Sequence, residues 1–209
     1  MKCLQKIILA VFAGLLVANP VAAQNTEGQV DFTPFVGVLI PLSDVVESGA
    51  LATGSEAAKH EVDFLIGGKL TYWFQSEWGI GLELLYAPNA IESDAFGIPG
   101  TVDAQFFNLN ARLVYDFGKD PTKPAFLLTG GLGFFATSYD DPLDMTTGGM
   151  GLLGLGLTIP VAEALALRID LSDYITVTRW EIPGGGKTDK ILQNDITLTA
   201  GLTFSFNKD

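Results

Sequence analysis

The chain has 209 residues, 24 of them acidic and 12 basic, which gives a formal net charge of −12, and its mean hydropathy is positive at +0.33. So acidic a chain is poorly suited to binding nucleic acid, and its single cysteine excludes an internal disulfide framework. Charges or prolines interrupt every longer apolar run after the first residues, so no membrane-spanning helix of about 20 residues is predicted.

The N-terminus predicts a cleaved export signal over residues 1–23. Lys2 and Lys6 precede an uncharged apolar run at 7–17, and small residues lead to a cleavage point after Ala23. A membrane anchor is the alternative, but the run is shorter than a spanning helix needs. Cys3 lies before the apolar run, where lipidation is not expected. Cleavage would remove this only thiol and, with both lysines, change the formal charge from −12 to −14.

Residues 24–209 are expected to form one domain. They are apolar on average and rich in glycine, and they contain no helix that could span a bilayer. An exported chain of this kind can cross a membrane only as a closed barrel, which satisfies every backbone hydrogen bond between strands.

The first three strands are predicted at 29–41, 61–74 and 78–86. In the second and third strands, a face of mostly large apolar side chains alternates with a face of mixed glycine, polar, charged and apolar residues, which is the period of a strand with two unlike faces. The first strand alternates less well. Its Pro34 cannot donate to a β-ladder and suits a strand end or bulge.

The next four strands are predicted at 104–117, 125–137, 149–159 and 164–172. The first and last of these alternate clearly between apolar and polar residues. The stretch at 149–159 is rich in glycine, and its leucines are assigned to the outward face.

The final strand, 194–206, has the cleanest pattern in the chain. Every second residue is apolar, and the residues between them are small or polar. The apolar set is Ile196, Leu198, Ala200, Leu202, Phe204 and Phe206. This pattern suits a wall with lipid on one side and a crowded interior on the other.

The connections alternate in length. Short turns are predicted at 75–77, 118–124 and 160–163, and longer loops at 42–60, 87–103, 138–148 and 173–190. Nine aromatic residues fall near the short-turn end, as in the girdle at a membrane interface: Phe32, Tyr72, Phe74, Trp78, Tyr115, Phe117, Phe126, Phe204 and Phe206. The sequence therefore predicts an all-β fold, an eight-stranded antiparallel up-and-down transmembrane β-barrel. A secreted soluble barrel or sandwich is the alternative.

The end of the last strand resembles the C-terminal assembly signal of bacterial outer-membrane barrels, carried here by Thr199, Gly201, Phe204 and Phe206. The family pattern stops at the last aromatic, whereas this chain continues over 207–209. As a whole, residues 24–209 resemble the small eight-stranded outer-membrane families of the OmpA membrane domain and OmpW. The resemblance implies a bacterial outer-membrane location, contact with lipid and lipopolysaccharide, and recognition of the last strand by the barrel-assembly machinery.

Charged residues on inward faces are the main candidates for a site. Eight strands leave a bore that side chains fill, and buried charges must find partners. Lys69, Glu83, Arg112, Arg168 and Asp170 are predicted to form one network in the lumen. Asp63, Asp116 and Asp195 are the other inward charges. The network is expected to fill and stabilise the lumen; the alternative is a gate that rearranges to pass small ions.

Other candidates are weaker. His60, the only histidine, lies near Ser55, Glu56 and Glu61, and lipid A-modifying barrels similar in size use a histidine with a serine and an acid. The usual motifs around such residues are not recognisable here. Acidic residues at 44–47 and 140–144 lack the spacing of a calcium loop, and glycines 184–186 lack that of a phosphate loop. No metal site or cofactor is predicted.

The expected function is that of a non-enzymatic membrane barrel with a filled lumen, which contributes to envelope integrity or surface interaction through four long loops. A narrow channel or a carrier of small hydrophobic compounds, as in OmpW, is the alternative, and a lipid A-modifying enzyme is a remote one. The sequence does not indicate a ligand or an oligomeric state.

Overall fold

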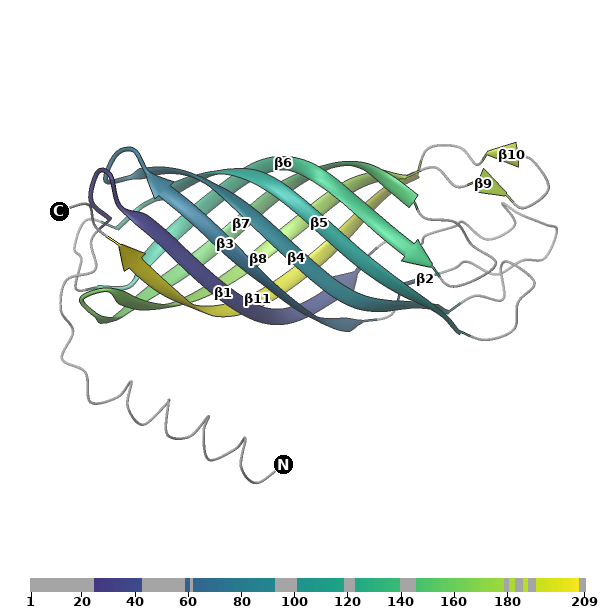
Figure 1. Cartoon of the computed structure of the whole chain (residues 1–209), viewed down its shortest axis with the longest axis horizontal. Helices are drawn as coiled ribbons and strands as arrows, with labels where there is room; N and C mark the ends of the chain where they lie inside the picture. Colours follow the sequence, from purple (N-terminus) through teal and green to yellow (C-terminus); the bar gives the residue numbers. More distant parts are fainter. Residues whose placement is uncertain are drawn as a thin grey trace, which may run out of the picture.

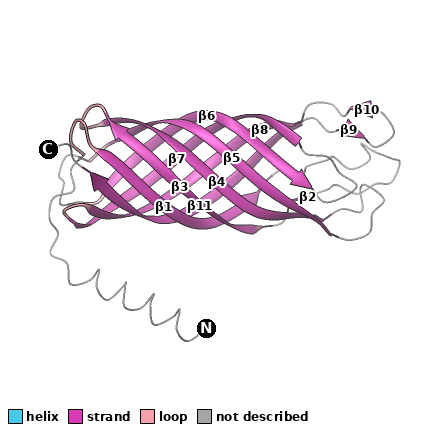
Figure 2. Cartoon of the chain, in the orientation of Figure 1, coloured by secondary structure: helices cyan, strands magenta, loops and turns pink. Residues whose placement is uncertain are grey.

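Eight long antiparallel strands close into a barrel in the computed structural model (Figure 1). The structure describes residues 25–42, 59–60, 62–92, 101–118, 123–139, 146–178, 181–182, 186–187 and 191–206, so the predicted export signal lies outside the described residues. Within these ranges every element is a strand, and no helix could cross a membrane (Figure 2). The predicted fold class is confirmed.

The barrel strands are β1 (Val30–Pro41), β3 (Asp63–Trp73), β4 (Trp78–Glu92), β5 (Thr101–Asp116), β6 (Ala125–Tyr139), β7 (Thr146–Ala162), β8 (Leu165–Thr178) and β11 (Ile191–Phe206). The two-residue strand β2 (Lys59–His60) pairs with the end of β4, and β9 (Glu181–Ile182) pairs with β10 (Gly186–Lys187). Each barrel strand pairs with the next along the chain, and β1 pairs with β11 to close the wall.

The strands are staggered around the wall. Starting at Leu157 on β7 and stepping from partner to partner through all eight strands, the path returns to β7 at Thr147, ten residues away. With a rise of about 3.3 Å per residue and about 4.8 Å between strands, this stagger tilts the strands by about 40°. That tilt and strand number leave a bore that side chains can fill.

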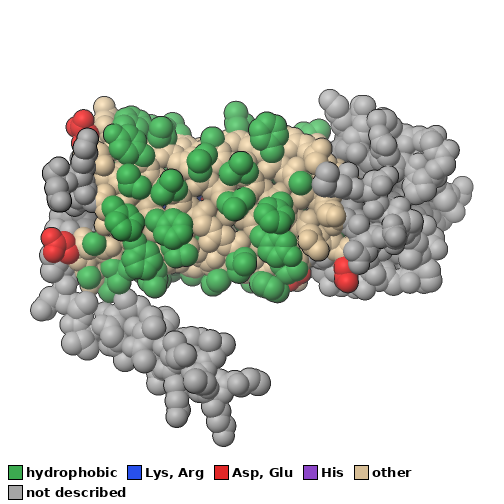
Figure 3. Space-filling model, in the orientation of Figure 1, with side chains coloured by type: hydrophobic (Ala, Val, Ile, Leu, Met, Phe, Trp, Pro, Cys, Tyr) green, Lys and Arg blue, Asp and Glu red, His purple; other side chains and the backbone are tan. Residues whose placement is uncertain are grey.

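The two faces of the wall differ in exposure along every barrel strand. On β4, for example, Leu84 is 50% exposed on the outer face while its neighbour Leu85 is fully buried in the bore. The outer face is covered with hydrophobic side chains, and in the view of Figure 3 acidic side chains lie only toward the two ends of the described wall. The predicted inward and outward faces of the eight strands are confirmed.

Aromatic residues form two belts on the outer face. The predicted girdle lies at the end where β1 begins and β11 ends, called the turn end here. In it the Tyr115 ring lies 4.7 Å from both Trp78 and Phe117, measured between ring centroids. A second belt lies toward the loop end and consists of Phe64, Tyr86, Phe107 and Phe134, with 5.0 Å between the Tyr86 and Phe107 centroids. The sequence prediction did not include this second belt.

Three of the four predicted loops, 87–103, 138–148 and 173–190, were too long. Strand β4 continues to Glu92, β5 begins at Thr101, and β8 continues to Thr178. The extensions of β4 and β5 lack a clear apolar alternation because they lie beyond the second belt, where both faces of a strand can be polar. In β8 the alternation continues through Ile175 and Val177, but Asp173 interrupts the outward apolar run. β-ladder pairing, which the hydropathy pattern does not record, carries the strands onward.

Candidate functional site

Ion pairs join the five predicted network residues at the middle of the bore. The Lys69 Nζ atom lies 2.7 Å from Asp170 Oδ2 and 3.7 Å from Glu83 Oε2, and Arg112 Nη1 lies 3.2 Å from Glu83 Oε2. These side chains are almost fully buried. We call Lys69, Glu83, Arg112, Arg168 and Asp170 the charge layer.

Arg168 and Asp170 make the closest contact in the charge layer. They lie two residues apart on β8 and therefore on the same face. Arg168 Nε donates to both carboxylate oxygens of Asp170, at 3.0 and 2.9 Å, and Nη2 donates to Oδ1 at 2.9 Å. With Lys69 on the other side, Asp170 holds two cations. Charge-assisted contacts of this kind offset the cost of burying the charges.

Neutral side chains complete the charge layer. The Tyr174 hydroxyl donates to Glu83 Oε1 at 2.5 Å, and Lys69 Nζ donates to Thr199 Oγ1 at 3.3 Å and lies 4.6 Å from the centre of the Phe35 ring. Sequence reasoning missed Tyr174 because it fell in a predicted loop. Its burial and its hydrogen bond to Glu83 show that it points into the bore beside the charges.

An apolar layer fills the bore between the charge layer and the loop end. Phe106 and Phe135 stack with 6.2 Å between ring centroids. Seven of the eight barrel strands contribute to this cluster, which consists of Phe35, Leu39, Leu65, Leu85, Ala87, Phe106, Phe135, Met150, Leu152 and Tyr174. Because they come from nearly all sides, these side chains reach across the bore.

A third group closes the bore at the turn end. Trp73 Nε1 donates to Asp31 Oδ2 at 2.7 Å, and the Trp73 ring forms a small buried cluster with Val114 and Leu127. Asp116, one of the predicted inward charges, accepts hydrogen bonds from Asn25 Nδ2 at 2.5 Å and from the Gly118 N–H at 2.6 Å. Residues 25–29 thereby help to close the bore at the turn end.

The remaining predicted residues lie apart from the charge layer. Asp63 and Asp195 are half-buried near the loop end, and Asp63 Oδ1 accepts from the Phe64 N–H at 2.6 Å. His60 pairs through its backbone with Ile91. Ser55, Glu56, Glu61, the acidic stretches at 44–47 and 140–144, and residues 183–185 lie outside the described residues. Among the described residues no three His, Cys, Asp or Glu side chains are grouped for a metal.

The proposed assembly-signal residues divide between the two faces of β11. Thr199 is buried and contacts Lys69, and Gly201 lies close to the Pro34 carbonyl and the Phe35 side chain. Phe204 and Phe206 lie on the outer face, 40% and 59% exposed. Residues 207–209 lie outside the described residues.

Several buried polar atoms in the bore have no hydrogen-bond partner among the described residues. On β5, Asn108 Nδ2, Asn110 Oδ1 and Arg112 Nε occupy successive inward positions, and Thr129 has an unpaired hydroxyl. Buried polar atoms of this kind commonly bind water.

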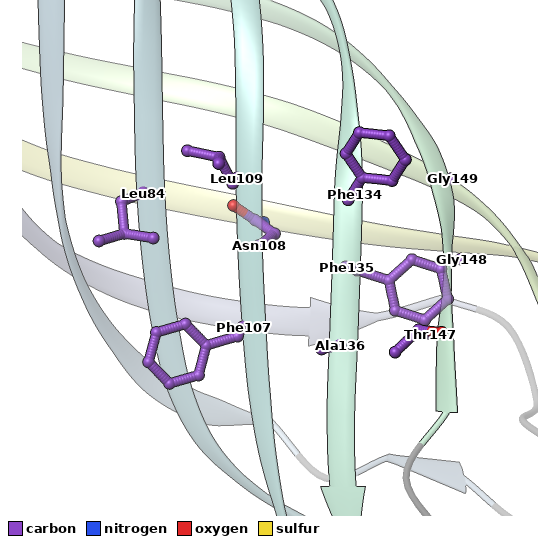
Figure 4. A pocket seen from close by; sticks show the side chains of 10 residues that line it. All are labelled: Leu84, Phe107, Asn108, Leu109, Phe134, Phe135, Ala136, Thr147, Gly148 and Gly149. Atoms are coloured by element: carbon purple, nitrogen blue, oxygen red, sulfur yellow. The ribbon is translucent and has the colours of Figure 1, made fainter.

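The outer wall carries two hollows along β5 and β6. One, of about 510 Å³, lies between the outward side chains Leu84, Phe107 and Leu109 on one side and Phe134 and the strand β7 at Gly149 on the other (Figure 4). The other, of about 640 Å³, lies nearer the turn end over Ala111 and Gly130. Both are lined almost wholly by apolar atoms on the outer wall.

Comparison with known proteins adds three findings. The family model described as "Outer membrane protein beta-barrel domain" matches residues 8–204. The chain is similar to OprG from Pseudomonas aeruginosa (TM-score 0.61, 18% identity, covering 90% of this chain and 100% of that one) and to Neisserial surface protein A (0.60, 14%, 86% and 98%). It is also similar to E. coli outer membrane protein W (0.52, 15%, 87% and 99%). No curated protein matches the chain. At these identities the structures support the fold, and they agree with the resemblance drawn from the sequence.

Proposed function

The chain belongs to the outer membrane protein β-barrel domain family, and on this premise we propose that it is a non-enzymatic outer-membrane barrel with a closed lumen. Its role is to contribute to envelope integrity or to surface interactions through the loops at the end of the barrel away from both chain ends. The turn end then faces the periplasm and the loop end faces the cell exterior. Lipopolysaccharide contacts the outer wall, and the assembly machinery recognises Thr199, Gly201, Phe204 and Phe206.

The filled bore is the observation that carries this proposal. The charge layer and the apolar layer lie one above the other; four barrel strands contribute side chains to the first and seven to the second. A solute passing through would have to break buried ion pairs and also displace packed aromatic rings. Breaking one buried ion pair alone costs about 3–5 kcal/mol, so a closed state is strongly favoured.

Planar-bilayer conductance tests the closed lumen. Glu83 and Leu85 are neighbouring inward residues on β4, one in each layer. We expect the wild-type barrel to leave the bilayer conductance at its protein-free level and Glu83→Ala/Leu85→Ala to produce discrete openings. Heat-dependent migration on SDS gels checks that each variant is folded. Steady unitary currents from the wild type would refute the closed lumen.

A narrow ion channel is the second candidate. The unpaired polar atoms of Asn108, Asn110 and Arg112 follow one another along β5, and a file of bound water there would give small ions a path beside the ion pairs. This candidate predicts wild-type currents that Arg112→Ala changes in size or ion selectivity. The same recordings therefore separate the two proposals.

The lipid A-modifying alternative has a separate test. If His60 acts on lipid A, overexpression shifts the lipid A mass and His60→Ala abolishes the shift. Our proposal expects an unchanged mass spectrum for both proteins.

Envelope integrity is measured by the detergent sensitivity of cells lacking the protein, which we expect to rise.

A further inference from the structure

Asp173 lies on the lipid-facing side of the wall. On β8 the inward residues are Arg168, Asp170, Ser172, Tyr174 and Thr176, all buried, so Asp173 belongs to the opposite face. Its partners across the two neighbouring strands are Leu153 on β7 and Ile196 on β11. A carboxylate therefore stands in an apolar wall.

The position lies on the membrane side of the loop-end aromatic belt. Asp173 is five residues from the loop end of β8 at Thr178, and the outward residues between them are Ile175 and Val177. With the rise and tilt given above, five residues correspond to about 13 Å along the barrel axis. The stagger places Asp173 slightly inside the loop-end aromatic belt. Among the described strand residues it is the only charged one on the outer face between the two belts.

Asp173 forms no ion pair with a lysine or arginine among the described residues. Its Oδ1 atom is enclosed and accepts no hydrogen bond from the described residues. By contrast, Asp170, three residues earlier, holds two cations. The charged group that interacts with Asp173 is another acid, Asp195 on β11. Ionisable groups inside a membrane are costly and normally pair with an opposite charge, so an acid without a cation points to a partner outside the chain.

On the loop-end side of Leu153, the wall near Asp173 is low. Gly149 and Gly151 face outward on β7. A methyl group added at Gly149 would meet nothing within 4 Å, and one at Gly151 would meet only the Ile175 carbonyl at 3.9 Å. On the far side of this glycine surface, Leu132 and Phe134 protrude from β6, 75% and 74% exposed. Small residues allow a neighbouring backbone to approach closely, as they do between membrane helices.

We propose that the outer face of β7, β8 and β11 around Asp173 docks a membrane-spanning protein that presents a lysine or arginine at the same depth. Charge complementarity defines this partner. A second copy of this chain would oppose one carboxylate with another, and the described outward strand positions between the belts hold no lysine or arginine. The inference rests on the membrane position of the wall and is independent of whether the lumen conducts.

Site-directed photocrosslinking in intact outer membranes tests the proposal. A benzophenone amino acid replaces Leu153, which faces Asp173 and is 60% exposed, and in a control it replaces Leu70 on β3, which is 47% exposed. We expect an adduct with a different membrane-spanning protein from position 153 and not from position 70. Asp173→Asn should lower its yield at least fivefold, while Asp173→Glu, which keeps the charge, should retain it.

Charge exchange completes the test. The captured protein must carry a lipid-facing lysine or arginine. Replacing that cation by an acidic residue in the partner, together with Asp173→Lys in this chain, should restore the adduct. Four outcomes would overturn the proposal: an adduct insensitive to Asp173→Asn, an adduct with a second copy, an adduct with lipid alone, or no adduct. The heat-dependent gel shift verifies that every variant is folded.

Discussion

The inward and outward faces of the wall treat the same kinds of side chain in opposite ways. Asp170 and Asp173 lie three residues apart on β8, yet the first holds Lys69 and Arg168 while the second faces lipid with an enclosed, unpaired oxygen. Leucines differ in the opposite sense. On the outer face they meet lipid, as expected of apolar side chains, whereas in the bore they pack against one another in the apolar layer. In this barrel, the environment that a face meets decides what a residue contributes, and residue type alone does not.

The two aspartates provide the largest expected contrast. Asp170→Leu should lower the free energy of unfolding by about 3–5 kcal/mol, because it leaves two buried cations without their carboxylate. Asp173→Leu should raise it by about 1 kcal/mol, because it removes an unpaired charge from the lipid face. Urea titration of the protein refolded in lipid vesicles measures both. Equal losses for the two variants would contradict the difference between the faces.

The arginines refine the inward side. Arg112→Ala and Arg168→Ala should each lower the free energy of unfolding by about 3 kcal/mol, since each leaves a buried acid with one cation fewer. The matched control is Glu77→Ala in the exposed turn between β3 and β4, expected to change it by less than about 0.5 kcal/mol. Thermal melting in detergent ranks the three. Unchanged melting of both arginine variants would mean that the network contributes nothing to stability.

Adjacent leucines on β4 test the apolar layer. Leu85→Ala should lower the free energy of unfolding by about 2–4 kcal/mol because it opens a cavity in the apolar layer. Leu84→Ala should lower it clearly less, since lipid chains fill the space left on the outer face. The urea midpoints of the two variants in the same vesicles give the comparison. If Leu84→Ala proved the costlier change, the bore would not be packed as described.

Alanine substitutions at two glycines should change the free energy of unfolding least. At Gly133, on the inward face of β6, a Cβ atom would collide with the Leu109 carbonyl and Asn110 Oδ1, so Gly133→Ala should cost about 1–3 kcal/mol. At Gly149, on the outward face of β7, the space is open, and Gly149→Ala should be neutral or stabilising by about 0.5 kcal/mol. Chemical denaturation of both variants measures the difference. A loss at Gly149 as large as that at Gly133 would contradict it.

The fold was predictable because membrane strands repeat one simple pattern. Two-residue alternation assigned the face of residues such as Leu84 and Leu85, and the alternation of short and long connections indicated an antiparallel barrel. The strand ends were not predictable by this route. Beyond the aromatic belt at Tyr86, backbone pairing continues to Glu92 without any hydropathy signal.

The site was predictable in membership and not in geometry. Alternation places Lys69, Glu83, Arg112, Arg168 and Asp170 on inward faces, but which cation meets which acid depends on the stagger between strands. Tyr174 and Asp173 were missed for one shared reason: both fell in a stretch assigned to a loop. A loop assignment hides the alternation that would have pointed one side chain toward the bore and the other toward lipid.

The seam between β1 and β11 has a consequence for the time course of folding. Every other pairing in the wall joins strands that follow each other closely, but at the seam Val30 pairs with Phe206, 176 positions further along the chain. Such long-range pairing is intrinsically slow, because the conformational entropy of the intervening chain is lost before the contacts of the seam stabilise the barrel. Until the last strand arrives, the sheet has two open edges able to join other chains. A nascent chain therefore has to be kept from aggregating until its final residues have been delivered.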